Sequence, residues 1–249
     1  MVRMRTYDLV SMALHSNDGL YIRDLGRVAY TDALALQQGT HAALVAGRDL
    51  GQVPMTLFLL EHDPPVITVS RRPSAAGHLV ATPELLARHG VTVEPTDRGG
   101  DITYHGPGQL VAYPILDLNR LGLRIHSYMR MLEDIVIDTI AEFGVMGERD
   151  SSATGVWVNG RKICAMGVRV SRWVSMHGLA LNVSTNLEHF ALIVPCGLVG
   201  REVTSLAKEC GSSAPSMTTV KSRLGARFIE RVEAQLAPKG PSDGGTLRA

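Results

Sequence analysis

Cys196 is the strongest candidate nucleophile in this chain of 249 residues. It stands between a proline and a glycine after the apolar pair Ile193-Val194, a pattern that favours a turn on which a thiol can be exposed. A nearby cation lowers the pKa of such a thiol and raises the fraction of reactive thiolate. The alternative role for a cysteine is a buried, structural one. We expect that role for Cys164, inside a strand-like segment, and for Cys210, after a Lys-Glu pair.

Lys162 and two histidines compete as the partner of such a thiol. Lys162 follows an Asn-Gly turn, where a solvated hairpin lysine is the ordinary alternative. As a partner, a lysine supplies a cation to the thiolate and then carries a proton. His105 lies in a glycine-rich run and His177 precedes Gly178, and a Cys–His pair is the commoner way to activate a thiol. Spacing alone does not choose between the lysine and the histidines.

The run of sixteen residues from Arg98 to Tyr113 has the composition of a binding segment, with four glycines, a proline and a histidine. Glycine lets the backbone approach a ligand or adopt a positive φ. The run is neither a phosphate loop nor a dinucleotide fingerprint, and a tight β-turn is the alternative interpretation. Arg98 is a candidate to hold an anionic group, with a structural ion pair as its alternative role.

The elements that must position these residues are hairpins mixed with isolated helices. Asn159-Gly160 fits a type I′ turn between two strands, and a second hairpin is predicted around Ser171-Arg172. Periodicity and turn residues predict further strands over 20–25, 55–60, 66–69 and 110–116, and helices over 30–45, 83–89, 126–143 and 219–236. This mixture predicts a mixed α/β (α+β) single domain, whose mixed, largely antiparallel sheet is flanked by helices. The domain is expected over 19–237, with an N-terminal extension over 1–18 and a disordered tail over 238–249.

Composition excludes several classes of function. The formal net charge is +1, from 25 basic and 24 acidic residues, so no basic excess supports binding to nucleic acid. No apolar run approaches the roughly 20 residues that cross a bilayer. Three sparse cysteines and an N-terminus without an apolar signal core lead us to expect a cytoplasmic protein. No CxxC or HExxH pattern is present, and we expect no metal site.

Taken together, these motifs resemble the octanoyltransferases, the lipoyl(octanoyl) transferases of lipoate biosynthesis, often called the LipB family. The resemblance covers roughly residues 20–210 in order. It implies a fold similar to the catalytic domain of biotin/lipoate protein ligases. Two departures, Ser70 in place of glycine and Leu179 in place of phenylalanine, remove no reactive group. The resemblance rests on 98–113, 155–158, 160–163, 167–169, 177–182, 194–197 and 203–206.

The resemblance implies acyl transfer through a thioester, with no cofactor. The cysteine aligned with Cys196 takes octanoate from octanoyl-acyl carrier protein, and the lysine aligned with Lys162 lowers the pKa of the thiol and serves as acid and base. A lysine of a lipoyl domain then forms an amide; the implied acceptors are lipoyl domains of 2-oxoacid dehydrogenases and the glycine cleavage H protein. The substrate-contacting residues that it implies are Arg98, Gly99, Gly100, Asp101, Ile102, Thr103, Tyr104, His105, Ala165, Met166, Gly167, Gly178, Leu179 and Ala180.

Two other functions stay open at this point. The first is an ATP-dependent lipoate or biotin ligase of the same fold, which activates the acid as an adenylate and needs no thiol nucleophile. The second is a non-catalytic module that binds acyl carrier protein or lipoyl domains, against which the presence of both Lys162 and Cys196 argues. A docking surface for acidic acyl carrier protein is predicted at Arg71, Arg72, Arg169 and Arg172.

Overall fold

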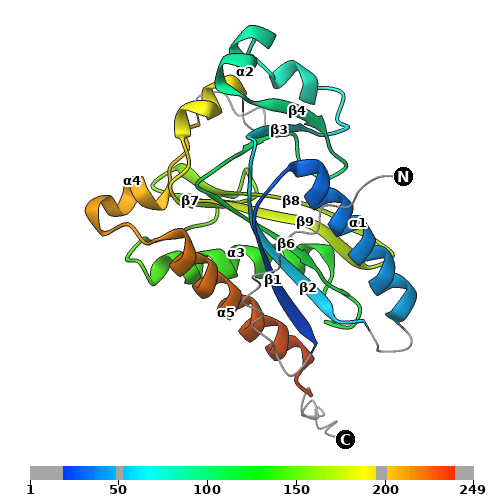
Figure 1. Cartoon of the computed structure of the whole chain (residues 1–249). Coiled ribbons are helices and arrows are strands. Elements are labelled where there is room, and N and C mark those ends of the chain that lie inside the picture. Colours follow the sequence, from blue (N-terminus) through cyan, green and yellow to red (C-terminus); the bar gives the residue numbers. More distant parts are fainter. Residues whose placement is uncertain (1–18, 49–52, 195–200, 239–249) are drawn as a thin grey trace, which may run out of the picture.

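Two β-sheets form the frame of the protein, and helices pack around them (Figure 1). This computed structural model describes residues 19–48, 53–194 and 201–238. The larger sheet has six strands in the order β1-β2-β6-β9-β8-β7, and the smaller has three in the order β4-β3-β5. The strands are β1 Leu20–Val28, β2 Met55–His62, β3 Val66–Val69, β4 Thr92–Pro95, β5 Ile102–His105, β6 Gln109–Ile115, β7 Val156–Val158, β8 Arg161–Ser171 and β9 Val174–Asn182. The helices are α1 Tyr30–Gly47, α2 Pro83–His89, α3 Ile125–Ala141, α4 Leu206–Cys210 and α5 Met217–Leu236, with 3₁₀ turns at Ala75–His78, Leu187–Leu192 and Gly211–Ser213.

The large sheet is mixed and mainly antiparallel, as predicted. Only β1 and β2 pair in parallel within it, while β2–β6, β6–β9, β8–β9 and β7–β8 are antiparallel. Every residue of β6 and β9 is buried, because helices or other segments cover both faces of these central strands. The middle of the large sheet is therefore a rigid floor on which side chains can be held.

Helices cover the large sheet, as the apolar stripes in the sequence predicted. In Figure 1, α3 and α5 lie along its lower side, α1 stands at the right, and α2 lies with the small sheet at the top. The predicted stripe of α3 is buried, including Leu132, Val136 and Ile140 at helical spacing. α2 has the predicted bounds, because Thr82 accepts a hydrogen bond from the Leu85 N–H at its start and Gly90 ends it with a φ of 62°.

The glycine-rich run from 98 to 113 joins the two sheets, which the sequence did not predict. Its first half contains β5, which pairs with β3 in the small sheet. Its second half is β6, which pairs with β2 and β9 in the large sheet. The run contains a tight turn, in which the Gln109 N–H donates to the carbonyl of Gly106 at 3.1 Å, but it also supplies one strand to each sheet and crosses between them.

The two hairpins follow the turn residues closely. Asn159 and Gly160 have φ values of 50° and 75°, which is the positive-φ pair of the predicted type I′ turn. The second hairpin turns at Arg172-Trp173, one residue later than predicted, because Ser171 still pairs with Val174. Both turn residues adopt positive φ, of 50° and 63°.

Some predictions fall outside the described residues. These are Cys196, the extension over 1–18 and all but the first residue of the tail over 238–249, so the domain boundaries stay predictions. None of the helices in the described part of the chain is long and apolar enough to cross a membrane.

Candidate active site

A pocket lies between the glycine-rich run and strands β8 and β9, with about 520 Å³ of empty space that includes open solvent. All of the substrate-contacting residues implied by the resemblance line it, except Gly99 and Tyr104. Gly99 instead donates its N–H to the carbonyl of Val168, and the Tyr104 side chain packs in the cluster of the small sheet. The structure adds three aromatic residues to the lining, namely Tyr30, Tyr113 and His177.

Glycine makes this pocket possible by letting backbones approach. Gly167 and Gly178 face each other in the pairing of β8 with β9. A Cβ on Gly167 would lie 2.6 Å from the carbonyl oxygen of Gly99, and one on Gly178 would lie 2.3 Å from that of Ala112. Real Cβ atoms do not come so close, so any side chain here would push the run away from the sheet.

The side chain of Arg98 is held in place by hydrogen bonds to neighbouring segments of the protein. Its guanidinium donates to the carbonyl and hydroxyl oxygens of Thr68, at 3.0 and 2.9 Å, and to the carbonyl of Gly99 at 3.1 Å. These bonds tie the start of the glycine-rich run to β3. Arg98 therefore shapes the pocket wall through hydrogen bonds to neighbouring segments, and its role in holding an anionic group stays a prediction.

Lys162 is buried, with a side chain that packs on Trp157. Only 7% of Lys162 is exposed, so the alternative of a solvated hairpin lysine is wrong. The two residues are cross-strand partners on β8 and β7, and the Lys162 Nζ lies 4.7 Å from the centre of the indole ring. The Lys162 N–H donates to the carbonyl of Glu202 and its carbonyl accepts from the Thr204 N–H, both at 2.9 Å. The backbone of Lys162 is thus bonded to the chain that follows residues 195–200.

The two described cysteines are poor nucleophiles. Cys164 is fully buried in β8, and burial raises the pKa of its thiol to about 12. Burial also raises the pKa of Cys210, at the end of α4. Thiols with raised pKa values hold little thiolate near neutral pH. The buried, structural role predicted for Cys164 agrees with its position, whereas Cys210 is only partly buried. The remaining cysteine of the chain is Cys196.

His105 belongs to a buried polar network. Its Nδ1 lies 2.8 Å from Oε1 of Gln109, and Gln109 in turn donates to Asn182. Burial, the neighbouring His62 and Arg98 hold the pKa of His105 well below its usual value, so the ring is neutral and its Nδ1–H donates. This network fixes the orientation of the ring.

His62, which the sequence analysis did not single out, lies in the same buried region as His105. Its Nδ1 donates to the carbonyl of Val28 at 3.1 Å, and its Nε2 accepts from the Tyr113 hydroxyl at 2.8 Å. Burial lowers its pKa to about 4, so it is neutral at physiological pH. Its sequence position at the end of β2, before a proline-rich turn, carries no signal of this contact.

His177 forms a closed pair with Asp97, that is, a pair in which both carboxylate oxygens of the aspartate have a partner. Its Nε2 lies 2.8 Å from Asp97 Oδ1, and the other oxygen of Asp97 lies 3.0 Å from Arg169. Burial lowers the pKa of His177 and Asp97 offsets this only partly. For Asp97, burial acts to raise the pKa, but His177, Arg169 and Arg71 outweigh it and hold the pKa below its usual value.

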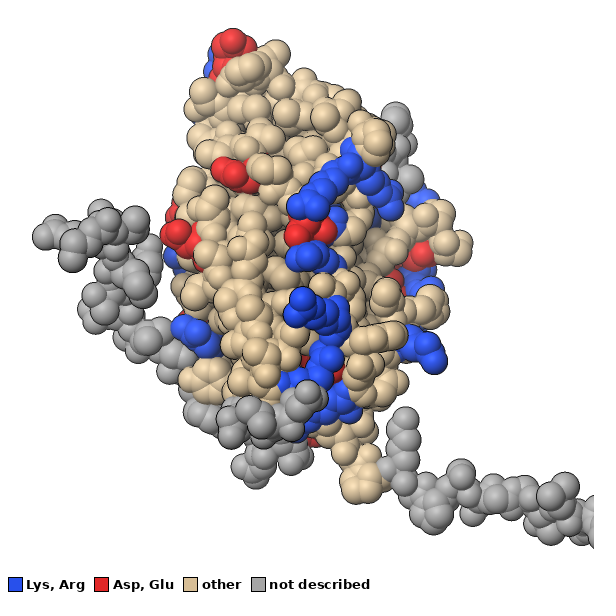
Figure 2. Space-filling model, turned by 90° about the vertical axis from the view of Figure 1, so that its right-hand side faces the viewer, with Lys and Arg blue, Asp and Glu red and all other residues tan. Residues whose placement is uncertain are grey.

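Figure 2 shows the side of the protein that carries α1, where basic side chains gather in a column. Arg169 lies 3.0 Å from Asp97 Oδ2, and Arg48, just after α1, lies 2.7 Å from Asp117 and donates to the carbonyl of Arg172. One of the four arginines predicted to dock acyl carrier protein is therefore paired with an acidic group. The docking of acyl carrier protein on Arg71, Arg72, Arg169 and Arg172 stays a prediction.

Among the described residues no group of three or more His, Cys, Asp or Glu side chains could hold a metal ion.

Comparison with known proteins identifies the family. The family described as "Lipoyl protein ligase A/B catalytic domain" matches residues 29–229. The chain belongs to this family. It is 49% identical over 224 residues to an octanoyltransferase of Chloroflexus aurantiacus, covering 86% of this chain and 97% of that protein. It is 50% identical over 220 residues to an octanoyltransferase of Solibacter usitatus, covering 87% and 94%. The enzyme class predicted by the resemblance, an octanoyl-transferring acyltransferase, is confirmed.

Solved structures of lipoate protein ligases share the fold. A bipartite lipoate protein ligase from Thermoplasma acidophilum superposes with a TM-score of 0.64 at 16% identity, covering 88% of this chain and 85% of that chain. A lipoate-protein ligase A bound with ATP gives a TM-score of 0.63 at 14% identity, covering 88% and 86%. The predicted lipoate ligase-like fold is therefore confirmed.

Proposed function

We propose that this octanoyltransferase moves an octanoyl group from octanoyl-acyl carrier protein to lysines of lipoyl domains, in the cytoplasm, with Cys196 as the nucleophile and Lys162 as its partner. The acceptors are the lipoyl domains of 2-oxoacid dehydrogenases and the glycine cleavage H protein. The observation that carries the proposal is the buried Lys162, whose backbone is bonded to the chain next to the Cys196 segment. We assign this activity to residues 19–237.

The first half of the reaction makes an acyl-enzyme. Lys162 takes the proton of the Cys196 thiol, and the thiolate attacks the carbonyl carbon of the octanoyl thioester. The new carbon–sulfur bond forms while the bond to the carrier sulfur breaks, and Lys162 returns the proton to the leaving thiolate of the carrier. No other activated group is needed, because the donor is already a thioester.

The pocket between the glycine-rich run and β8–β9 is the proposed site of the acyl chain. Its wall includes Ile102, Met166 and Leu179, and backbone at Gly167 and Gly178. Burial of apolar groups contributes about 0.8 kcal/mol per CH₂, so an eight-carbon chain gains several kcal/mol here. The second half is attack of an acceptor amine on the acyl-enzyme, which yields an amide and frees Cys196.

The test is to incubate the protein with octanoyl-acyl carrier protein, without ATP, and to measure the intact mass. We expect one added octanoyl group, its loss in Cys196→Ser, and its retention in the matched control Cys210→Ser. Lys162→Ala should keep a cooperative unfolding transition and slow acylation by about 100-fold, the usual scale for a proton-transfer group. Absence of any adduct without ATP would contradict the proposal and favour an ATP-dependent ligase. Normal turnover in Lys162→Ala would return the partner role to His105 or His177.

A further inference from the structure

The indole ring of Trp157 contacts two cations, and the reaction described above gives it no role. The Lys162 Nζ lies 4.7 Å from the centre of the ring, and the guanidinium carbon Cζ of Arg201 lies 4.8 Å from the same point. Trp157 is 1% exposed, so both contacts are made to a buried ring. Arg201 is the first described residue after 195–200. The ring therefore lies between the proposed acid–base residue and the chain that follows the Cys196 segment.

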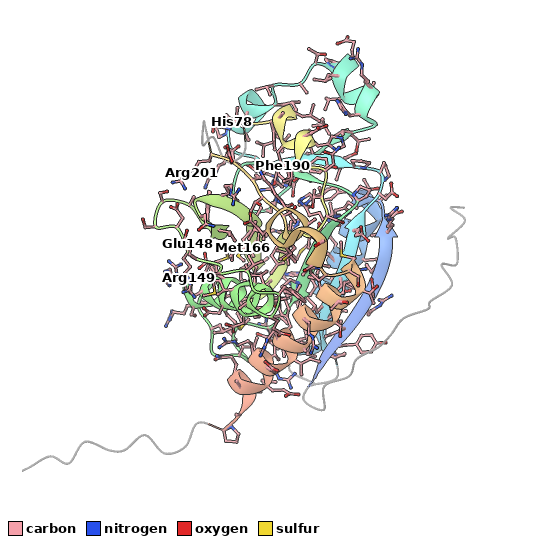
Figure 3. All side chains as sticks on the ribbon, turned by 90° about the vertical axis from the view of Figure 1, so that its left-hand side faces the viewer. His78, Glu148, Arg149, Met166, Phe190 and Arg201 are labelled. Atoms are coloured by element: carbon pink, nitrogen blue, oxygen red, sulfur yellow. The ribbon has the colours of Figure 1, made fainter. Side chains whose placement is uncertain are left out.

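Hydrogen bonds fix the orientation of the ring. The indole N–H of Trp157 donates to the carbonyl of Ala153 at 3.1 Å. The backbone of Trp157 exchanges two hydrogen bonds with Glu148, at 2.8 and 2.9 Å. Figure 3 shows Glu148 and Arg201 on the same side of the protein, where β7 is the edge strand of the large sheet. Trp157 is thus held by the loop that precedes its own strand, and its ring has little freedom to turn.

Arg201 is held against the ring by the same loop. Its guanidinium donates to the carboxylate of Asp150 and, at 3.1 Å, to the hydroxyl of Ser152. Asp150 also accepts a hydrogen bond from the Ser152 N–H at 2.8 Å. Hydrogen bonds from Ser152 and Arg201 hold the pKa of Asp150 below its usual value, so it is a carboxylate at neutral pH. Arg201 therefore braces the ring from a fixed position.

The side chain of Lys162 reaches the ring along a path that a glycine leaves open. Trp157 and Lys162 are cross-strand partners, so their side chains lie on the same face of the sheet. A Cβ on Gly155 would lie 3.4 Å from the Cε of Lys162 and 2.6 Å from the carbonyl oxygen of Cys164. A lysine side chain loses much rotamer freedom when it is fixed, and packing on the ring removes that freedom before the reaction begins. The face of an indole also attracts an ammonium group, so the ring holds Nζ most firmly when Lys162 carries the thiol proton.

We propose that Trp157 is a positioning residue for acyl-enzyme formation, whose ring holds the amine of Lys162 in place, and that Arg201 locks the ring. This inference rests on the proposed function, in which Lys162 takes the proton of the Cys196 thiol. Trp157 forms and breaks no bond in the step. The proton passes from the thiol to Lys162 Nζ and then to the carrier sulfur, and the ring stabilises the ammonium between these two transfers.

The test is a double-mutant cycle on the rate of acyl-enzyme formation. Trp157→Leu is made with Lys162 present and again in Lys162→Ala, and acylation by saturating octanoyl-acyl carrier protein is followed by intact mass. We expect Trp157→Leu to slow acylation by about 10-fold when Lys162 is present, the scale of a desolvated cation–π contact. In Lys162→Ala the same substitution should change the residual rate by less than about 2-fold, because a positioning residue acts only through the group that it holds.

A conservative variant and a control tie the effect to the ring face. Trp157→Phe keeps an aromatic face beside Lys162 and should restore acylation to within about 3-fold of the wild type. The donor concentration that gives the half-maximal rate should change by less than about 2-fold in both variants, because the ring holds Lys162 and not the donor. Trp173→Leu replaces the other tryptophan of the chain, which is exposed at the turn between β8 and β9, and should leave acylation unchanged.

Further outcomes keep this inference distinct from the proposed function. If Trp157→Leu fails to fold, Arg201→Gln carries the same cycle, because the Arg201 side chain is 36% exposed and its loss should slow acylation by about 3-fold only when Lys162 is present. Unchanged acylation in folded Trp157→Leu overturns the inference, and equal slowing with and without Lys162 assigns Trp157 a structural role and also overturns it. A wild type that accepts no octanoyl group, or a Lys162→Ala variant with a normal rate, overturns the proposed function instead.

Discussion

The pocket is bordered by two His–Asp pairs that differ in how completely they are satisfied. His177–Asp97 is closed, because both oxygens of Asp97 have partners and His177 is almost fully buried. His78–Asp101 is open, because one carboxylate oxygen lacks a described partner and the imidazole reaches solvent. The same two residue types therefore hold neighbouring segments together in one place and leave a carboxylate oxygen without a described partner in the other. Satisfaction of the polar atoms, and not residue type, distinguishes the two pairs.

Substitution of the glycines beside the two histidines should give the largest difference in stability between the two pairs. Gly178 follows His177, and Gly178→Ala would place a Cβ 2.3 Å from the Ala112 carbonyl oxygen. We expect a loss of about 3 kcal/mol in the free energy of unfolding, because the backbone cannot yield cheaply. Gly77 precedes His78, and a Cβ there would meet nothing within 4 Å. Gly77→Ala should change stability by less than about 0.5 kcal/mol in the same urea titration. Equal losses would show that both sides of the pocket are equally rigid.

Substitution of the two aspartates themselves should give a smaller difference in the free energy of unfolding. Asp97→Asn removes the charge that His177 and Arg169 share, and we expect a loss of about 2 kcal/mol at neutral pH. Asp101→Asn should cost less than about 1 kcal/mol, because only one of its oxygens has a partner and that partner is partly exposed. Chemical unfolding of the two variants beside the wild type measures both values. A larger loss in Asp101→Asn would contradict the description of the open pair.

The smallest expected effect is the pH dependence of the stability that Asp97 contributes. The folded state holds the pKa of Asp97 below its unfolded value of about 3.9, so the stabilisation is complete above that value and is lost as pH falls through the folded pKa. The gap in stability between wild type and Asp97→Asn should widen from about pH 7 to pH 5, because loss of Asp97 lowers the pKa of His177 further below its unfolded value, and should narrow below about pH 4 as Asp97 itself is protonated. Unfolding midpoints measured across this range test both parts of the prediction. A gap that does not narrow below about pH 4 would mean that another group carries the effect of Asp97.

Local structure was predictable from the sequence because its causes are local. α2 runs over the expected residues because a threonine cap and a glycine stop lie at its two ends. The Asn159-Gly160 turn follows from residues that tolerate positive φ. The second hairpin was misplaced by one residue because Arg172 and Trp173 carry no such preference. β5 was missed because its pairing with β3 joins residues far apart in the sequence.

The pocket was predictable in its segments and not in its contacts. The resemblance indicated the segments around Arg98, Met166 and Leu179, and the structure brings them to one pocket. Tyr113 comes to it from β6 at the end of the glycine-rich run, whereas Tyr30 comes from α1, where no motif in the sequence marks it. Lys162 illustrates the limit, because its neighbours in the sequence fit a solvated turn while its cross-strand partner Trp157 buries it.

The sequence by itself determined the chemical groups available to this protein, the family to which it belongs and most of its helices and strands. These follow from residue identity and from periodicities that span a few residues. Only the tertiary structure decided that Lys162 is buried, that Asp97 is satisfied and that Asp101 is not. The physical reason is that burial and hydrogen-bond satisfaction depend on which distant segments meet. His78 and Asp101 are 23 positions apart in the sequence and 2.7 Å apart in the fold.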